Sequence, residues 1–571
     1  MRNKLIIVLI FCLSFILYLL KIKPATNDDI FVYFNYARNF SEGRFFAIDY
    51  RNIPSEGFSS ILYMIMLVPF EFLKINPMLG GIILNYIAIF GIAYISYKIL
   101  NNLFPDKIEI NFSLSLFFGI LIFHSDISGV AGWAFETVYS GLVMMFLIYL
   151  ISKKDIDKNI NLIILFYIIG HLFRPENLII FSPLGLWLLF KLANTKKVLF
   201  TGLKVICGFL FLFLFKYFVF DDIFPTGYYR KFINLNQEIS SGTKYVSEWL
   251  FSAPFYHRIK NLYLAIGVFF VLLYISYKYK SESIYQGFFG LIFISFMIFL
   301  LNILFCLKTT PMIGYFNRYL ISSNVILIFF IFSLLSFIVS KIFSQQSQKY
   351  LSFLVLPFFI LLSIKERGLK GAVHNLFIID NLKSQYENHP YIKFGTFLRT
   401  NFPNHQNLTL SFGDGGALPY SAQCNTVDPA GLTEPYIARL AAYNGSDKVL
   451  KYSNHILSNK LDMFCLATEF SDTVRNVEGC FYGAHVPLSP EQIVEFYSIL
   501  AKNKFVYVCS ISAEHEGLPY DIHLLLNPGS PNFSSLSRVV KEYCRTHGFI
   551  REGDFIVECG KQRAVFPNLS R

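Results

Sequence analysis

Long apolar runs alternate with short polar connectors along the first 364 residues of the chain. The apolar runs cover residues 5–20, 80–99, 112–123, 134–151, 162–173, 178–190, 203–220, 262–277, 288–307, 320–339 and 351–364. Several approach the roughly 20 residues that a helix needs to cross hydrocarbon, and shorter runs extend through flanking aromatic residues. This pattern predicts a mainly α, multi-spanning transmembrane helical bundle of about 11 to 12 spans.

The pattern changes after residue 364, where Gly, Pro, Asn, His and charged residues return. Short β-rich runs follow, such as "NLTLSF", "FVYVCSIS" and "FIVECG", together with "SPEQIVEFYSILAKN", which has helical apolar spacing behind a serine cap. We therefore predict a transmembrane catalytic domain at 1–364 and a C-terminal α/β or α+β domain at 365–571. The "GDGGALP" segment lacks the pattern of a phosphate-binding loop, so a tight turn is favoured there.

Composition supports a membrane protein. The chain is 54% hydrophobic and only 15% charged, whereas a soluble globular protein carries about 25% charged residues. The formal net charge of +12 could indicate nucleic-acid binding, but in a membrane protein Lys and Arg mark cytoplasmic loops and contact lipid headgroups. No small-x-small cleavage site follows the first apolar run, so a retained first helix is predicted rather than a signal peptide.

Basic connectors orient the chain, because Lys and Arg accumulate in cytoplasmic loops. The connectors of this kind are 152–159, 191–197, 277–283 and 340–349. When they lie inside, the first loop (23–60), the turns near Glu136 and at 174–177, the loops at 221–260 and 308–319, and the C-terminal domain all lie outside. The apolar run 61–73 would break this alternation as a span, so a short or re-entrant helix at the outer face is expected.

Cysteines agree with this orientation. Six of the nine lie in the C-terminal domain, at Cys424, Cys465, Cys480, Cys509, Cys544 and Cys559. An even number concentrated there fits an extracytoplasmic, oxidising compartment and up to three disulfides. No C-x-x-C pair occurs among them, which argues against a zinc site.

Ionisable residues gather on the predicted external side. They are Asp28, Asp29, Arg38, Arg44, Glu56, Glu136, Arg174, Glu176, Arg230, Lys231 and Arg318. A charge in or beside a span costs free energy, so such residues are candidates for function, and their clustering predicts a polar cavity at the outer membrane boundary. A transport pathway tends to place charges nearer the midplane in two similar halves, and no such repeat is visible.

These charges suit sugar transfer from a polyprenyl phosphate, whose tail stays in lipid while its phosphate lies at the headgroups. Arginine suits the leaving phosphate through its planar fork and permanent charge. The acceptor hydroxyl needs a base within hydrogen-bond reach, and direct attack with a single base inverts the anomeric centre. Asp28 and Asp29 are then the catalytic candidates.

Each of these residues also has a structural explanation. An Asp pair behind a helix commonly caps the next helix, and "NDDIFVYFNYARNF" has the form of a capped helix. Arg174 and Arg318 could extend to the membrane interface without binding substrate. Glu136 could cap a helix or pair with an arginine. In the C-terminal domain, Asp428 and Glu434 fit an acceptor contact or a structural role equally well.

The segment "NDDIFVYFNYARNFSEGRFFAIDYRNIPSEGFSSILY" resembles the first external loop of bacterial polytopic GT-C glycosyltransferases. The resemblance is to the group that includes the terminal arabinofuranosyltransferase of the mycobacterial cell wall and the LphB-like proteins. The matching positions are Asp28, Asp29, Tyr36, Ala37, Arg38, Asn39, Glu42, Gly43, Glu56, Gly57, Phe58, Ser59 and Ser60. The resemblance implies a catalytic carboxylate at Asp28 or Asp29, with Asp28 favoured as the base and Asp29 as its neighbour.

Further segments are similar to motifs of the same family, namely "GWAFET", "FRPEN", "DDIFPTGYYRK", "NRYL" and, in the C-terminal domain, "FGDGGALPYSAQCNTVDPAGLTEPYIAR". The substrate-binding residues expected from the charge cluster and these motifs are Arg38, Glu56, Ser59, Glu136, Arg174, Glu176, Tyr228, Arg230, Lys231, Arg318 and Tyr319.

The resemblance implies a GT-C-type glycosyltransferase of the bacterial plasma membrane that uses a polyprenyl-phosphate sugar in cell-envelope biogenesis. The expected partners are that donor, an envelope glycan, lipid or protein acceptor, and membrane lipids, with no nucleic acid. No cofactor or metal site is assigned, although a pair of aspartates can bind a divalent cation. The alternative is a transporter or flippase of lipid-linked saccharides, which needs phosphate-binding arginines but no base. A third hypothesis, an assembly factor, is disfavoured by the charge cluster.

Overall fold

The structure is a computed structural model of the whole chain. It describes residues 28–103, 134–153, 156–192, 195–231, 283–308, 319–326, 387–413, 416–441, 443–469, 488–515, 518–548, 554–559 and 562–569, with single positions near 270 and 330. The apolar runs 5–20, 112–123 and 351–364 lie outside the described residues.

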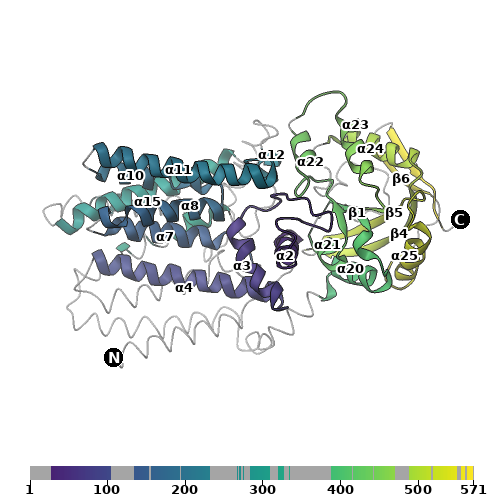
Figure 1. Ribbon diagram of the computed structural model, residues 1–571, viewed down its shortest axis with the longest axis horizontal. Helices are drawn as coiled ribbons and strands as arrows, with labels where there is room; N and C mark the ends of the chain where they lie inside the picture. The colour runs from purple at the N-terminus through teal and green to yellow at the C-terminus, as the bar shows by residue number, and fades with distance from the viewer. Residues whose placement is uncertain are drawn as a thin grey trace.

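The first part of the chain is a bundle of apolar helices (Figure 1). The helices are α4 (Pro77–Leu103), α7 (Val138–Ser152), α8 (Ile156–Phe173), α9 (Asn177–Ile180), α10 (Ser182–Lys191), α11 (Thr195–Phe220) and α15 (Ser283–Lys308). Within the described ranges, Pro77–Asn102, Ile156–Phe173 and Thr195–Phe220 are long and apolar enough to cross a membrane. These helices confirm the predicted mainly α architecture.

Three short helices lie where the bundle faces the C-terminal domain, namely α2 (Asp28–Ser41), α3 (Ile61–Phe72) and α12 (Thr226–Lys231) (Figure 1). Ser60 caps α3 by accepting a hydrogen bond from the backbone N–H of Tyr63. The 12 residues of α3 extend over about 18 Å, less than the roughly 30 Å of a bilayer core. This length fits the short helix expected at 61–73.

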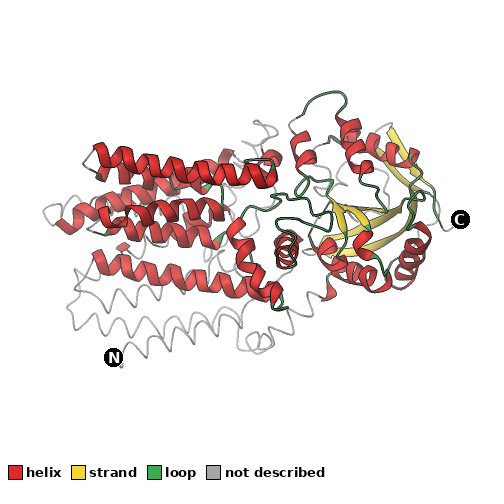
Figure 2. Ribbon diagram, in the orientation of Figure 1, coloured by secondary structure: helices red, strands yellow, loops and turns green. Residues whose placement is uncertain are grey.

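The C-terminal domain is built on a five-stranded sheet with helices on both faces (Figure 2). Its helical elements are α20 (Pro390–Asn401), the 3-10 turn His405–Asn407, α21 (Ala417–Ala422), α22 (Pro435–Leu440), α23 (Lys448–Ser458), α24 (Pro490–Lys502) and α25 (Phe533–His547). The strands are β1 (Thr409–Phe412), β2 (Asn425–Val427), β3 (Met463–Glu469), β4 (Val506–His515), β5 (Leu518–Leu526), β6 (Phe555–Cys559) and β7 (Gln562–Phe566).

The sheet has the strand order β2-β1-β3-β5-β4. The β1 strand pairs in parallel with β2 and β3, whereas β5 runs antiparallel to β3 and β4. The strands β6 and β7 form a separate antiparallel pair. Two apolar clusters cover the sheet, one shared with α20, α25 and the α2 helix, and the other with α22, α23 and α24. The domain is thus α/β, and its core continues into α2.

One disulfide, Cys509–Cys544, joins β4 to α25. Both cysteines are buried, which confirms one of the up to three disulfides expected in this domain. Cys424 and Cys465 are buried free thiols. Cys480 lies outside the described residues, and the side chain of Cys559 is not described.

Arg51, in the first loop, ties that loop to the C-terminal domain. Its guanidinium donates to the carboxylate of Asp49 at 2.8 Å and to the carboxylate of Glu434 at 2.6 Å. It also donates to the side chain of Asn459 and to the backbone carbonyl of Thr426. The backbone N–H of Thr426 in turn donates to Asp49 at 2.8 Å. One cation therefore neutralises two largely buried carboxylates from two parts of the chain.

Replacing Arg51 should loosen this attachment. Arg51→Ala leaves Asp49 without its cation and Glu434 with only His455 as a basic partner, so we expect the free energy of unfolding to fall by about 3 kcal/mol. Arg439→Ala is the matched control, because Arg439 pairs with Asp222 while 46% of its side chain is exposed, and it should cost less than about 1 kcal/mol. Thermal unfolding in detergent measures both, and equal losses would contradict the assignment.

Candidate active site

The first turn of α2 is docked on the C-terminal domain through Asp28. Its carboxylate accepts the backbone N–H of Ala417 at 2.7 Å and that of Gly416 at 3.1 Å. About two turns further along α2, the side chain of Asn35 donates to the carbonyl of Gly416 at 2.9 Å. The amides of the "GDGGALP" segment thus hold a carboxylate of the same chain, a contact that its sequence did not reveal.

Gly416 is required for this close approach. A Cβ atom at Gly416 would lie 2.1 Å from the backbone oxygen of Asp28, far inside van der Waals contact. The backbones of α2 and α21 therefore touch at the point where the two predicted catalytic aspartates begin α2.

The environments of the two aspartates differ. Both oxygens of Asp28 accept amide hydrogens, so each oxygen already has a hydrogen-bond donor from the C-terminal domain. Asp29 lies about 100° further around the helix, and both aspartates are partly exposed. Asp28 is therefore oriented firmly toward the C-terminal domain, while Asp29 is presented on another side of the helix.

A second group of side chains surrounds Arg174, in the turn after α8. The guanidinium donates to Glu136 at 2.6 Å and to Glu176 at 2.6 Å. The hydroxyl of Ser59 donates to Glu136 at 3.1 Å and lies 3.0 Å from the hydroxyl of Tyr33. The Tyr319 ring lies under the guanidinium, with its centroid 5.1 Å from Cζ. We call these six residues the Arg174 cluster.

The Arg174 cluster joins five residues predicted from separate segments, Ser59, Glu136, Arg174, Glu176 and Tyr319, and adds Tyr33, which was not predicted. Arg174 is buried between two carboxylates, so the cluster carries an excess negative charge around this cation. A phosphate could bind Arg174 only by replacing one of these carboxylates. The arrangement is suited to an exchange of partners, not to an open anion site.

Glu56, also predicted, forms a buried ion pair instead. Its carboxylate accepts from the ammonium of Lys216 at 2.7 Å, and both side chains are 3% exposed. Burial raises the pKa of Glu56 above its usual value, while Lys216 opposes that rise. The carbonyl of Glu56 accepts from the N–H and the hydroxyl of Thr226, which holds α12 against the loop.

Lys216 is a residue that the sequence analysis missed. It lies within "FLFLFKYFVF", a run in which it is the only charged residue. An isolated lysine inside an apolar helix is a signal for a buried partner, and this signal was available in the sequence. The identity of the partner, 160 residues away, was not.

The remaining predicted residues lie apart from the Arg174 cluster. Arg38 lies about 15 Å along α2 from Asp28, where it donates to the carbonyl of Tyr420 and to Asn35. Tyr228 is 37% exposed and stacks on Phe224. Arg230 and Lys231 belong to α12, but their side chains are not described, and Arg318 lies outside the described residues. Within the described ranges, no group of three His, Cys, Asp or Glu is placed to hold a metal ion.

The chain is similar to proteins whose structures have been solved. A crystal structure of ArnT from Cupriavidus metallidurans bound to undecaprenyl phosphate aligns with a TM-score of 0.50 and 10% identity, over 92% of this chain and 98% of ArnT. The chain has the fold of ArnT. This likeness confirms the expected fold, a helical membrane bundle followed by a C-terminal α/β domain, whereas membership of the GT-C glycosyltransferases and of the arabinofuranosyltransferase and LphB-like subgroup remains an expectation.

Two further structures align more weakly. They are ArnT from the same organism in the apo state, with a TM-score of 0.48, 11% identity and coverage of 92% and 98%, and the Archaeoglobus fulgidus oligosaccharyltransferase complex with zinc and sulfate, with a TM-score of 0.42, 10% identity and coverage of 90% and 72%. A family model described as a domain of unknown function (DUF8728) matches residues 379–508. No curated protein matches the chain by sequence.

The buried pair Glu56–Lys216 generates a pH-dependent prediction. Lys216→Met should lower the free energy of unfolding at neutral pH by about 3 kcal/mol, because it leaves a buried carboxylate without its cation. The folded-state pKa of Glu56 then rises further, so stability is retained at pH below about 4.5 and is lost as pH rises through the new pKa. Unfolding measured from pH 4 to 8 tests this.

The double variant Lys216→Met/Glu56→Gln is the control, since it removes both charges and should recover most of the stability at neutral pH. If the free energy of unfolding of the single variant Lys216→Met does not depend on pH, Glu56 is not a buried charged group.

The approach of α2 to α21 gives a second prediction. Gly416→Ala should displace the N-terminal turn of α2, because its Cβ has no room beside the Asp28 backbone. Gly227→Ala is the control, since nothing lies within 4 Å of a Cβ there. We expect faster amide exchange over residues 28–35 in the first variant only, measured by hydrogen–deuterium exchange. Equal exchange in the two variants would refute the docking.

Proposed function

We propose that this chain is a membrane glycosyltransferase that moves a sugar from a polyprenyl-phosphate donor to a cell-envelope glycan, lipid or protein at the external face of a bacterial plasma membrane. The proposal rests on the observation that Asp28 and Asp29 begin a helix that lies between an ArnT-like bundle and the C-terminal domain and is hydrogen-bonded to that domain. The ArnT structure with undecaprenyl phosphate supports a polyprenyl-linked donor. The basic connectors support the external placement of this face.

We assign the base to Asp29 and a positioning role to Asp28, which exchanges the roles expected from the resemblance. Asp28 has both carboxylate oxygens on amide hydrogens of the C-terminal domain, so its carboxylate is turned toward that domain and serves to position the helix. Asp29 begins the same rigid turn and is partly exposed. A base held on a fixed helix meets the positional requirement of general base catalysis.

The reaction is a direct displacement. The acceptor hydroxyl oxygen attacks the anomeric carbon while Asp29 takes its proton. The bond between that carbon and the phosphate oxygen breaks, and its electron pair leaves with the polyprenyl phosphate. One displacement inverts the anomeric centre, in line with the general logic of substitution at a sugar.

Arg174 supplies the positive charge in this scheme. In the structure its guanidinium is held by Glu136 and Glu176, and the departing phosphate would take the place of one of them. The hydroxyls of Ser59 and Tyr33, which already contact this network, can then donate to the displaced carboxylate or to the phosphate. The oriented donors would stabilise charge that develops only as the bond breaks.

The test compares two aspartate variants. In nanodiscs supplied with a polyprenyl-phosphate sugar extract of the native membranes, mass spectrometry measures the polyprenyl phosphate released, which is the same product for every sugar. Asp29→Asn should lower this rate at least about 100-fold, the usual contribution of a general base, with undecaprenyl phosphate binding unchanged within about twofold. Asp28→Asn should speed amide exchange at residues 416–420. The asparagine side chain has only one oxygen, so it cannot replace both carboxylate oxygens that accept the two backbone N–H groups.

Wild-type turnover in Asp29→Asn would exclude it as the base. Movement of lipid-linked saccharide across the membrane in both variants, without release of polyprenyl phosphate by the wild type, would instead favour the flippase.

A further inference from the structure

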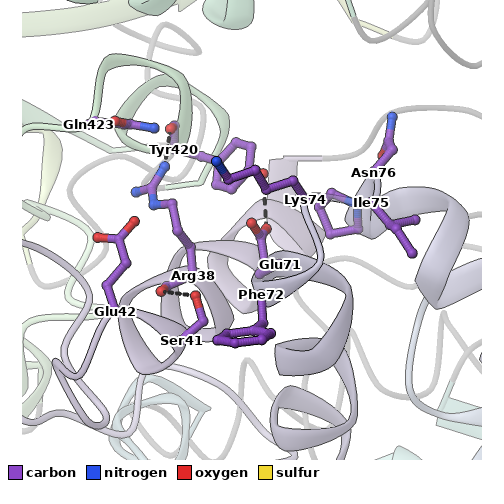
Figure 3. Close-up of a pocket in the computed structure, with 11 residues that line it drawn as sticks. Arg38, Ser41, Glu42, Glu71, Phe72, Lys74, Ile75, Asn76, Tyr420 and Gln423 are labelled. Carbon is purple, nitrogen blue, oxygen red and sulfur yellow. Dashed lines mark hydrogen bonds between the residues drawn. The ribbon is translucent and has the colours of Figure 1, made fainter.

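A cavity of about 560 Å³ opens between the end of α2, the turn that joins α3 to α4, and α21 (Figure 3). Its polar wall includes Arg38, Glu42, Glu71, Lys74, Tyr420 and Gln423. Arg38 follows Asp28 by ten residues on α2, about 15 Å along the helix axis. The cavity is therefore a separate site on the same helix, and the proposed reaction leaves it without a role.

Arg38 is held in place in this wall, whereas Lys74 is exposed at its edge. Arg38 is 6% exposed, and its guanidinium lies 4.8 Å from the centroid of the Tyr420 ring while it donates to the Tyr420 carbonyl. Lys74 follows the C-cap of α3 and has a positive φ of 56°, a conformation that directs the chain into the α3–α4 turn. In Figure 3 its side chain extends toward the side of the cavity where Arg38 and Gln423 lie.

The carboxylates of the wall offset these cations only in part. Glu42 is paired with Arg44. Glu71 accepts the hydroxyl hydrogen of Tyr420 at 2.9 Å, and burial raises the pKa of its carboxyl to about 7, so a large fraction is neutral at neutral pH. The cavity is thus net positive, and anions are favoured in it.

Apolar side chains border the same cavity. Phe72 is 72% exposed, Leu73 is 63% exposed and Ile75 is 39% exposed, and Phe72 and Ile75 also line the cavity. Large apolar side chains at the end of a membrane bundle, next to cations, are typical of contact with the headgroup and acyl boundary of a bilayer. One turn therefore presents an apolar edge and a cationic wall side by side.

We propose that this cavity binds the anionic headgroup of an amphiphile from the outer membrane surface, with Arg38 and Lys74 at the anion and Phe72, Leu73 and Ile75 against the apolar chain. The shared chemistry is a phosphate or carboxylate. A free anion would use only the cationic wall, whereas a lipid uses both parts. The membrane-facing edge favours the lipid.

The experiment follows amide exchange of residues 70–78 in three samples of the full-length protein. These are neutral phosphatidylcholine nanodiscs, the same nanodiscs with phosphatidylglycerol added in steps to 20%, and neutral nanodiscs with 10 mM inorganic phosphate. We expect slower exchange with phosphatidylglycerol and no change with inorganic phosphate. Equal protection by inorganic phosphate would overturn the amphiphile, and no protection in any sample would overturn the site.

Lys74→Gln should require about tenfold more phosphatidylglycerol for the same protection, the expected loss for one charge-assisted hydrogen bond. Lys197→Gln is the matched control, because Lys197 is an exposed lysine paired with Asp157 where α8 and α11 begin, at the other end of the bundle. An unchanged response in Lys74→Gln would overturn the role of the cationic wall.

Release of polyprenyl phosphate is measured in the same nanodiscs. If the protein releases polyprenyl phosphate but phosphatidylglycerol does not slow its amide exchange, this inference alone is refuted. A protein that shows protection without turnover refutes the proposed function alone.

Discussion

The arrangement depends on one carboxylate held by two amides. Asp28, the first residue of α2, accepts the backbone N–H groups of Gly416 and Ala417 and so fixes the start of that helix on the C-terminal domain. Asp29, the proposed base, occupies the same turn, and Arg38, in the proposed lipid site, lies further along the same helix. Movement of this contact would shift both sites together, because α2 is a single rigid element.

Around this contact, the buried charges between bundle and domain are compensated in small groups. Lys216 neutralises Glu56, Arg51 neutralises Asp49 and Glu434, and Arg174 lies between two carboxylates. A buried charge without a partner costs several kcal/mol, so each group specifies one geometry more strongly than it adds stability. Pairs of this kind position side chains for chemistry but leave few unbound cations. The substrate phosphate must therefore compete with carboxylates already in place.

Much of the candidate site was predictable from local sequence. Glu136, Arg174 and Glu176 lie in turns next to apolar runs, and charge at such positions is costly enough to indicate function, while Ser59 was expected from the family motif. Their mutual contacts and the role of Tyr33 were not predictable, because a tyrosine in an amphipathic helix resembles any core residue. The preference for Asp28 over Asp29 as base came from the resemblance, and the amide contacts of Asp28 now favour the reverse assignment.

The sequence alone determined the helical bundle and the α/β character of the C-terminal domain, because hydropathy, span length and strand composition act over a few neighbouring residues. Only the tertiary structure decided which charges meet. Gly416 contacts Asp28 across 388 positions of sequence through a backbone N–H that every non-proline residue carries, so no side-chain pattern marks it. Buried charges need partners because removing a charge from water costs free energy. Which residues become partners depends on how distant segments pack together, so the local sequence does not identify them.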